Sequence, residues 1–221
     1  MNPNEFAYIS NETVILEAAT KLFYDNGYNK TSCAQIAKEA GLSKASIFYY
    51  YPSKIEVANR VYFSYTKNTK EIVTQKMMNH DFTYNLQLGT AIELCLEMDM
   101  YKQDEKAFRF MKEFFDNNFQ ILYKEPPVEF YALHRRRYNL PFTDDELKVI
   151  AALSSTSSTA LMLMYFSGET QLSYDAVLRM RLRSPFEAMG IPNEQIDEIL
   201  ERSLLLRNEL NFTIEPYFKI K

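Results

Sequence analysis

Glycine is scarce in this sequence, with five residues among 221, and this scarcity limits the turns that the chain can make. Tight β-hairpins favour an Asn-Gly or Asp-Gly pair between two runs of alternating apolar and polar residues, and no such pair joins two alternating runs here. The one Asn-Gly pair, at residues 26–27, follows a helical pattern, where glycine commonly ends a helix. These features favour an all-helical protein.

Cysteine and histidine are rarer still, with two residues of each. Cys33 and Cys95 fall on separate helical patterns and make a poor disulfide framework. Together with His80 and His134 they offer none of the usual spacings of zinc ligands. We expect neither a metal nor a cofactor.

Long apolar runs are also missing from the sequence. No stretch approaches the roughly 18 uninterrupted apolar residues that indicate a membrane-spanning helix. Glu5 and Glu12 interrupt any apolar run near the amino terminus, so no secretory signal is expected. These absences predict a cytoplasmic protein without membrane attachment.

The charge balance argues against a protein that coats nucleic acid nonspecifically, because the net charge is −4 and the pI is about 5.4. It does not argue against a small domain that reads a specific DNA sequence. Residues 1–55 contain five lysines, five acidic residues and no arginine. Because this segment is neutral overall, any DNA affinity must come from where its charges are placed and not from bulk charge.

Helix boundaries are well marked in the first quarter of the chain. Ser10 or Asn11 can cap a first helix that Gly27 ends. Ser32 with Gln35 forms a capping box that opens a second helix. The expected helices cover residues 12–26, 32–40 and 44–51, followed by a long helix from residue 54 to about residue 78 that is opened by Ser53 with Glu56.

The second and third of these helices are joined by a tight turn. Ala37 is the small residue needed where the two helices cross, Gly41 suits the turn, and Ile47 anchors the next helix in the core. Tyr-Pro-Ser-Lys follows at residues 51–54. This spacing is typical of a helix-turn-helix, whose second helix enters the DNA major groove.

The rest of the chain keeps a helical pattern, over residues 84–101, 104–123, 128–138, 143–167, 174–188 and 193–211. We expect an all-α fold of about nine or ten helices, with an N-terminal three-helix helix-turn-helix domain and a larger helical ligand-binding and dimerisation domain. The predicted division, into residues 1–54 and 55–221, falls at the start of the long fourth helix.

Residues 14–57 resemble the DNA-binding domain of the TetR family of bacterial transcriptional regulators. The resemblance is carried by Ala18, Ala19, Leu22, Phe23, Gly27, Tyr28, Thr31, Ile36, Ala37, Ala40, Gly41, Leu42, Ser43, Ile47, Phe48, Tyr51 and Lys54. It covers about a fifth of the chain. The remainder resembles the family only in length and helical content, which is usual for its variable effector domain.

The resemblance implies phosphate contacts at the edges of the expected DNA-binding domain, residues 1–54, which is called the reading unit below. Ser32, at a helix start, would hold a phosphate through its hydroxyl and neighbouring amides. Tyr50 and Lys54 would hold phosphates at the other end of the unit.

The resemblance also implies that Lys44, Ser46 and Tyr49 face base edges or the adjacent backbone, and Ala45 lies among these DNA-contacting positions. Ala45 stands where the family commonly has glycine or proline, with little expected consequence. Phe48 replaces a usual tyrosine, so a hydroxyl contact is lost. With no arginine nearby, Lys44 is the candidate for a guanine contact.

The aromatic run at residues 48–51 has a second interpretation, as core and surface side chains without a role in binding. We assign Phe48 and Tyr51 to the core, and Tyr49 and Tyr50 to DNA contact.

The helical body offers a candidate ligand pocket. Aromatic and methionine residues recur at helical spacing and could line an apolar cavity, with polar tips that orient a ligand. The candidates are Met98, Tyr101, Phe108, Met111, Phe115, Tyr131, Met162 and Tyr165. The alternative is an ordinary packed core. The arginines at residues 135–137 either face solvent or anchor an anionic ligand.

Two helical segments, 146–166 and 194–210, are candidates for a homodimer interface. The first contains a run of small residues at 154–160 that permits close approach of another helix. The second carries an apolar stripe that includes Ile196, Leu200 and Leu204. In the resembled family, helices in these positions pair across a two-fold axis. The alternative is that both stripes pack within the chain.

These features favour a ligand-responsive transcriptional regulator, a repressor that binds a pseudo-palindromic operator on double-stranded DNA as a dimer. The effector would be a small molecule of unidentified structure. One rival is a regulator whose helical body binds a protein partner instead. An enzyme is disfavoured, because the sequence has no nucleophile elbow, phosphate-binding loop, paired metal ligands or Cys-His pair.

Overall fold

The computed structural model describes residues 10–81, 83–123 and 125–221. Within these residues the chain forms ten α-helices, one 3₁₀ turn and one two-stranded hairpin, which confirms the all-α expectation. The helices are α1 (Asn11–Asn26), α2 (Cys33–Glu39), α3 (Lys44–Tyr50), α4 (Lys54–Asp81), α5 (Leu86–Gln103), α6 (Glu105–Asn117), α7 (Glu125–Tyr138), α8 (Asp144–Phe166), α9 (Tyr174–Ala188) and α10 (Asn193–Glu209).

The expected caps form at the ends of α1 and α2. At the start of α4 the Glu56 amide donates to the Ser53 hydroxyl at 3.4 Å, which is one half of the expected capping box. Ser10 caps α1 by accepting a hydrogen bond from the amide of Thr13, and Gly27 follows the helix at a φ of 81°. Capping boxes open α2, at Ser32 and Gln35, and α8, at Thr143 and Glu146. The helices of the reading unit are thus fixed by local interactions that the sequence encodes directly.

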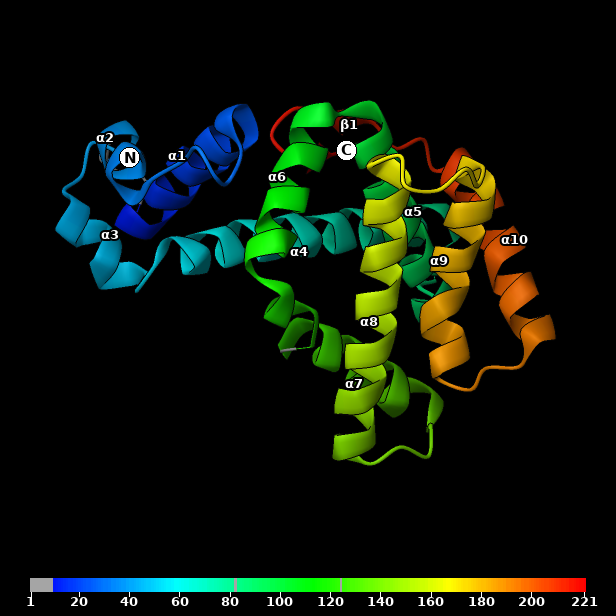
Figure 1. Cartoon of the computed structure of the whole chain (residues 1–221). Helices are drawn as coiled ribbons and strands as arrows, with labels where there is room; N and C mark the ends of the chain where they lie inside the picture. The colour runs from blue at the N-terminus through cyan, green and yellow to red at the C-terminus, as the bar shows by residue number, and fades with distance from the viewer. Residues whose placement is uncertain (1–9, 82, 124) are drawn as a thin grey trace, which may run out of the picture.

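Helix α4 runs from the end of the molecule that holds α1, α2 and α3 into the helical body beside α5 (Figure 1). Its 28 residues correspond to roughly 42 Å at 1.5 Å per residue, a little longer than the sequence suggested. The first part packs against α1, and the later part against α5. One continuous apolar core joins the two ends, because Ile15, Val61 and Leu96 belong to the same buried cluster. Movement at one end of α4 is therefore resisted along its whole length.

Helix α5 lies at the centre of the body, with most of its residues buried. Helices α4, α6, α9 and α10 pack around it, and α8 packs against α7 and α9. In Figure 1, α8, α9 and α10 lie side by side as upright rods. The body is therefore a helical bundle built around one buried rod.

Two features of the body differ from the sequence-based expectation. The helix expected over 104–123 divides, because α6 ends at Asn117 and a 3₁₀ turn covers Phe119–Tyr123. A short hairpin, β1 (Ile214–Glu215) with β2 (Lys219–Ile220), follows α10. Its turn holds Tyr217 and Phe218 at positive φ, which the sequence did not indicate because neither residue is glycine. Phe218 is buried against Tyr24, Tyr65 and Phe110, so tertiary packing stabilises this turn.

Helix α8 is long and apolar enough to cross a membrane on length and composition alone, with a mean hydropathy of 1.5 over its most apolar window. Here it packs along one side against α7 and α9 and leaves much of its apolar surface exposed. The exposed apolar surface of α8 needs a separate explanation.

Candidate DNA-binding surface and cavity of the body

The geometry of α2 and α3 is that of a helix-turn-helix. Gly41 occupies the turn at a φ of 67°, a conformation that disfavours other residues. The amide of Leu42 donates to the carbonyl of Ala37 at 2.9 Å, and the Ser43 hydroxyl caps α3 by accepting from the amide of Ser46. Ile47 is fully buried beneath α3. These contacts fix the angle at which α3 leaves the domain.

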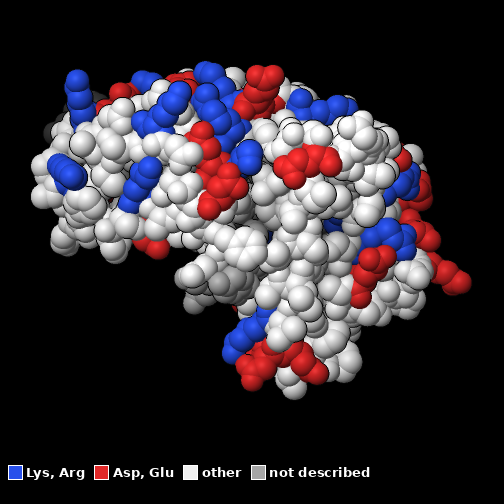
Figure 2. Space-filling model, viewed as in Figure 1, with Lys and Arg blue, Asp and Glu red and all other residues white. Residues whose placement is uncertain are grey.

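The outer face of α3 carries lysine and tyrosine side chains. Lys44 and Ala45 are exposed, and Tyr49 is 84% exposed, far more than a core tyrosine. Tyr50 is 37% exposed and its ring packs edge-on against Tyr49 at 5.1 Å. Ser46 is half-buried, with its hydroxyl 2.9 Å from that of Ser43. On the face seen in Figure 2, this end of the molecule shows separate lysines on a mostly uncharged surface.

The two aromatic residues assigned to the core behave differently. Tyr51 is buried, and its hydroxyl donates to Glu12 at 3.2 Å. Burial raises the pKa of Tyr51 to about 12, so the phenol stays neutral and can donate. Phe48, in contrast, is 44% exposed, and the expectation of a core role is wrong. The seven-residue helix turns Phe48 to the side of Lys44, whose ammonium lies 5.6 Å from the ring centroid.

The residues assigned to phosphates at the edges of the unit also have partners within the chain. Ser32 is exposed, but its hydroxyl contacts the side chain and amide of Gln35 in the capping box. Lys54 donates to the carbonyl of Tyr28 at 2.9 Å and lies 3.9 Å from the centroid of that ring. Partial burial lowers the pKa of Lys54. Through these two contacts Lys54 stabilises the reading unit, in addition to any contact with a phosphate.

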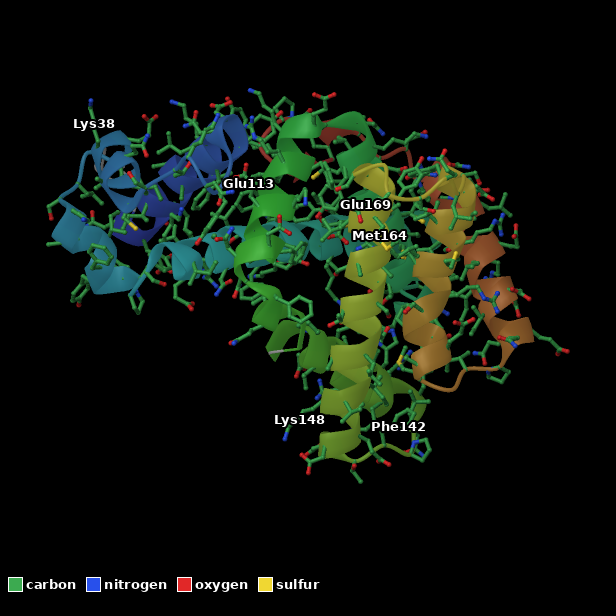
Figure 3. All side chains as sticks on the ribbon, in the orientation of Figure 1. Lys38, Glu113, Phe142, Lys148, Met164 and Glu169 are labelled. Carbon is green, nitrogen blue, oxygen red and sulfur yellow. The ribbon has the colours of Figure 1, made fainter. Side chains whose placement is uncertain are left out.

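A row of polar residues on α6 holds the end of α1, a contact that the sequence did not indicate. Arg109 donates to the carbonyls of Tyr24 and Asp25, at 3.0 and 2.8 Å. Glu113 accepts from the amide of Asn29 at 2.7 Å, and Figure 3 labels it on α6, between the body and the reading unit. The sequence does contain polar residues at helical spacing opposite the aromatic stripe of α6, and this pattern could have indicated the contact.

A cavity of about 720 Å³ lies between α4, α5, α7 and α8, with α6, α9 and the 3₁₀ turn contributing to its wall. Apolar and aromatic side chains line it together with hydroxyl groups of α8, among them Ser154, Ser158 and Thr159. The volume is within the range of small-molecule sites in proteins. A cavity of this size can accommodate an organic molecule of moderate size.

Two of the eight predicted pocket residues, Phe115 and Tyr131, line this cavity. The other six lie outside its wall: Met98, Tyr101, Phe108, Met111, Met162 and Tyr165. Four of them are buried core residues, and Phe108 and Tyr165 are half-buried against other aromatic rings. Helical spacing identifies a buried stripe but does not distinguish a filled core from a cavity wall, which explains why only two of the eight residues line this cavity.

Several polar residues beside the cavity have partners within the chain. His134 is buried, with Nδ1 2.9 Å from the carbonyl of Phe130 and Nε2 3.4 Å from the Thr90 hydroxyl. Burial lowers the pKa of His134, so the imidazole is neutral, donates through Nδ1 and accepts through Nε2. Arg135 and Arg136 pair with Asp144 and Glu129. The run at residues 135–137 therefore fits a surface role better than a ligand anchor.

Residues 15–61 match the family model described as bacterial regulatory proteins, tetR family. The HTH-type transcriptional regulator YuxN of Bacillus subtilis (strain 168) is 28% identical over 205 residues, which cover 91% of this chain and 66% of that protein. The regulator LmrA of the same organism is 35% identical over 71 residues, covering 32% of this chain and 36% of that protein. The matches thus span just under two thirds of the first relative and about a third of the second.

Among solved structures, full-length native TylP, a TetR regulator from Streptomyces fradiae, has a TM-score of 0.46 with this chain at 17% identity. The alignment covers 90% of this chain and 97% of that chain.

Proposed function

The chain belongs to the TetR family of bacterial regulatory proteins, and on this premise we propose that it is a DNA-binding transcriptional regulator that responds to a small molecule. The exposed lysine and tyrosine face of α3, held at helix-turn-helix geometry, is the observation that carries the proposal. Residues 1–54 form the reader and residues 55–221 the effector and dimerisation body. The protein acts in the cytoplasm as a repressor on a pseudo-palindromic operator.

Selection from a random pool of duplex DNA with the purified chain tests this function. We expect enriched sequences with two inverted half-sites, because a symmetric dimer presents two copies of α3 about one DNA turn apart, roughly 34–36 Å or somewhat more. Failure to retain any duplex at low salt, where phosphate contacts are strongest, would overturn the proposal.

Lys44 is proposed to read a base, and a matched lysine is available as a control. Lys44→Met is expected to relax base preference at one position of each half-site and to cost about 1–3 kcal/mol of binding free energy. Lys38→Met removes the same charge from α2, where Figure 3 shows Lys38 projecting away from α3. That variant should keep the base preference of the original protein. Repeating the selection with both variants measures the difference, and an unchanged preference in Lys44→Met would refute the base contact.

The homodimer is proposed to form through α8. One face of this helix carries exposed residues at helical spacing, namely Val149, Leu153, Ser157, Ala160 and Met164. Monomeric proteins rarely expose such an apolar stripe, so it suits a self-complementary interface around a two-fold axis. The small residues at its middle permit close approach of the second copy.

The second segment expected at the interface, 194–210, is a weaker candidate. Its stripe of Ile196, Ile199, Leu200 and Ser203 is buried within the chain, where α10 packs against α5 and α9. The outer face of α10 is largely charged. Met180 of α9 is 51% exposed and α9 packs directly on α8, so we propose α9 as the flanking helix of the interface in place of α10.

Response to an effector is proposed to pass through α6. Phe115 lines the cavity, whereas Arg109 and Glu113 on the same helix hold residues 24–29 of the reader. A molecule that binds more tightly when α6 is shifted would move the reading unit together with that helix. The size of this effect is limited by the difference between the affinities of the molecule for the two positions of α6. The cavity favours a small effector over a protein partner, since its volume is that of a small-molecule site and several helices of the body form its walls.

A further inference from the structure

The cavity has an aromatic wall contributed by three helices. The rings that line it are Tyr62, Phe63 and Tyr65 of α4, Phe115 of α6, and Phe130 and Tyr131 of α7. Aromatic faces carry negative electrostatic potential and attract cations as well as flat apolar molecules. The wall therefore suits a ligand that combines a ring system with positive charge.

One carboxylate of the cavity differs from the other two in its lack of an ion-pair partner among the described residues. Glu97 pairs with Arg181, and Glu129 pairs with Arg136. Glu93 of α5 also lines the cavity, but its Oε1 is buried and has no hydrogen-bond partner among the described residues. Burial raises the pKa of Glu93 to about 7. A buried carboxylate oxygen without a partner is costly, and a donor supplied by a ligand would remove that cost.

Lys70 of α4 is the cation that acts on Glu93, whereas Arg60 and Lys67, which also line the cavity, pair with Glu12 and Glu71. Lys70 lines the same cavity, and its charge partly offsets the effect of burial on the Glu93 pKa. It is half-buried, and no ion pair joins it to Glu93 in the part of the chain that the structure describes. An anionic ligand would have to lie beside a buried carboxylate, whereas a cationic ligand would only approach a partly solvated lysine. The second arrangement costs less, because partial hydration screens the lysine charge.

We propose that the cavity binds a cationic heteroaromatic amine, with an N–H group of the cation donating to Glu93 and the rings packed against the aromatic wall. The inference rests on the proposed function, since it names the chemical class of the effector. The carboxylate supplies selectivity for charge, and the rings supply selectivity for a flat apolar frame. The hydroxyl groups of α8 can accept or donate further hydrogen bonds along the opposite wall.

Three probes that share one ring system test the proposal on the full chain without DNA. Aminoacridine is a cation at neutral pH, acridone is neutral, and acridine carboxylate is an anion. Fluorescence titration should show aminoacridine binding at least tenfold more tightly than either of the other two. Equal affinity for the three probes, or the tightest binding by the carboxylate, would overturn the proposal.

Two substitutions in the cavity should act in opposite directions. Glu93→Gln keeps the size of the side chain and removes its charge, and we expect aminoacridine affinity to fall at least tenfold. Lys70→Met removes the opposing charge, so affinity should stay the same or rise. If the cavity were an anion site, Glu93→Gln would raise the affinity for its ligand and Lys70→Met would lower it. Thermal unfolding monitors folding of each variant, and if Glu93→Gln fails to fold, the probe series and Lys70→Met still decide the matter.

The DNA selection separates this inference from the function on which it rests. A chain that enriches operator sequences but shows no preference for the cationic probe refutes the aromatic amine and leaves the regulator intact. A chain that retains no duplex refutes the proposed function, whichever probe it binds.

Discussion

Leu153→Asp is expected to leave the protein monomeric and to reduce its affinity for a selected operator by at least about a hundredfold. Leu153 is 68% exposed at the middle of the apolar stripe on α8. A two-fold axis through this stripe would bring the two substituted carboxylates close together and desolvate them without partners. The loss of affinity follows because a dimer holds its second α3 near the second half-site, whereas a monomer must bind each half-site separately.

Sedimentation at micromolar protein concentration and operator titration measure the two effects. Leu205→Asp is the matched control, since Leu205 is also an exposed leucine, at 63%, but lies on the charged outer face of α10. It should remain dimeric and bind the operator normally. A dimeric Leu153→Asp protein would exclude α8 as the interface, and a monomeric Leu205→Asp protein would restore α10 to it.

Local signals predicted most of the secondary structure, because each cap depends on residues a few positions apart. The capping box at Ser32 and Gln35 opens α2 as expected, and the one at Thr143 and Glu146 opens α8. Gly168, at a φ of 75°, follows the end of α8, where the sequence predicted a stop. These interactions need no information about the rest of the fold.

The features that depend on contacts between distant segments were the ones that the sequence did not reveal. Phe115 and Phe108 lie on the same helix, yet only Phe115 lines the cavity, because Phe108 packs on Phe166 of α8. The pairing of Glu113 with the amide of Asn29 spans more than 80 positions. Periodicity shows which face of a helix is apolar, but not which element covers it.

Arg181→Met is expected to destabilise the body by about 3–5 kcal/mol, the range measured when one partner of a buried ion pair is removed. Arg181 of α9 and Glu97 of α5 are 4% and 8% exposed, and the guanidinium donates to the carboxylate. The Tyr101 hydroxyl donates to the same carboxylate at 2.8 Å. Methionine preserves much of the volume but leaves the Glu97 charge buried with only that hydroxyl as donor. Urea unfolding at fixed protein concentration measures the loss.

The double substitution Arg181→Met with Glu97→Leu distinguishes an unpaired charge from lost packing. If the buried carboxylate causes the instability, removing it should recover most of the stability lost in the single variant. Recovery will be incomplete, because Arg181 also donates to the Ser158 hydroxyl at 3.3 Å and lies 3.1 Å from the Met162 sulfur. A double variant no more stable than Arg181→Met would show that α9 depends on the arginine for packing, and that the ion pair contributes little to holding α9 against α5.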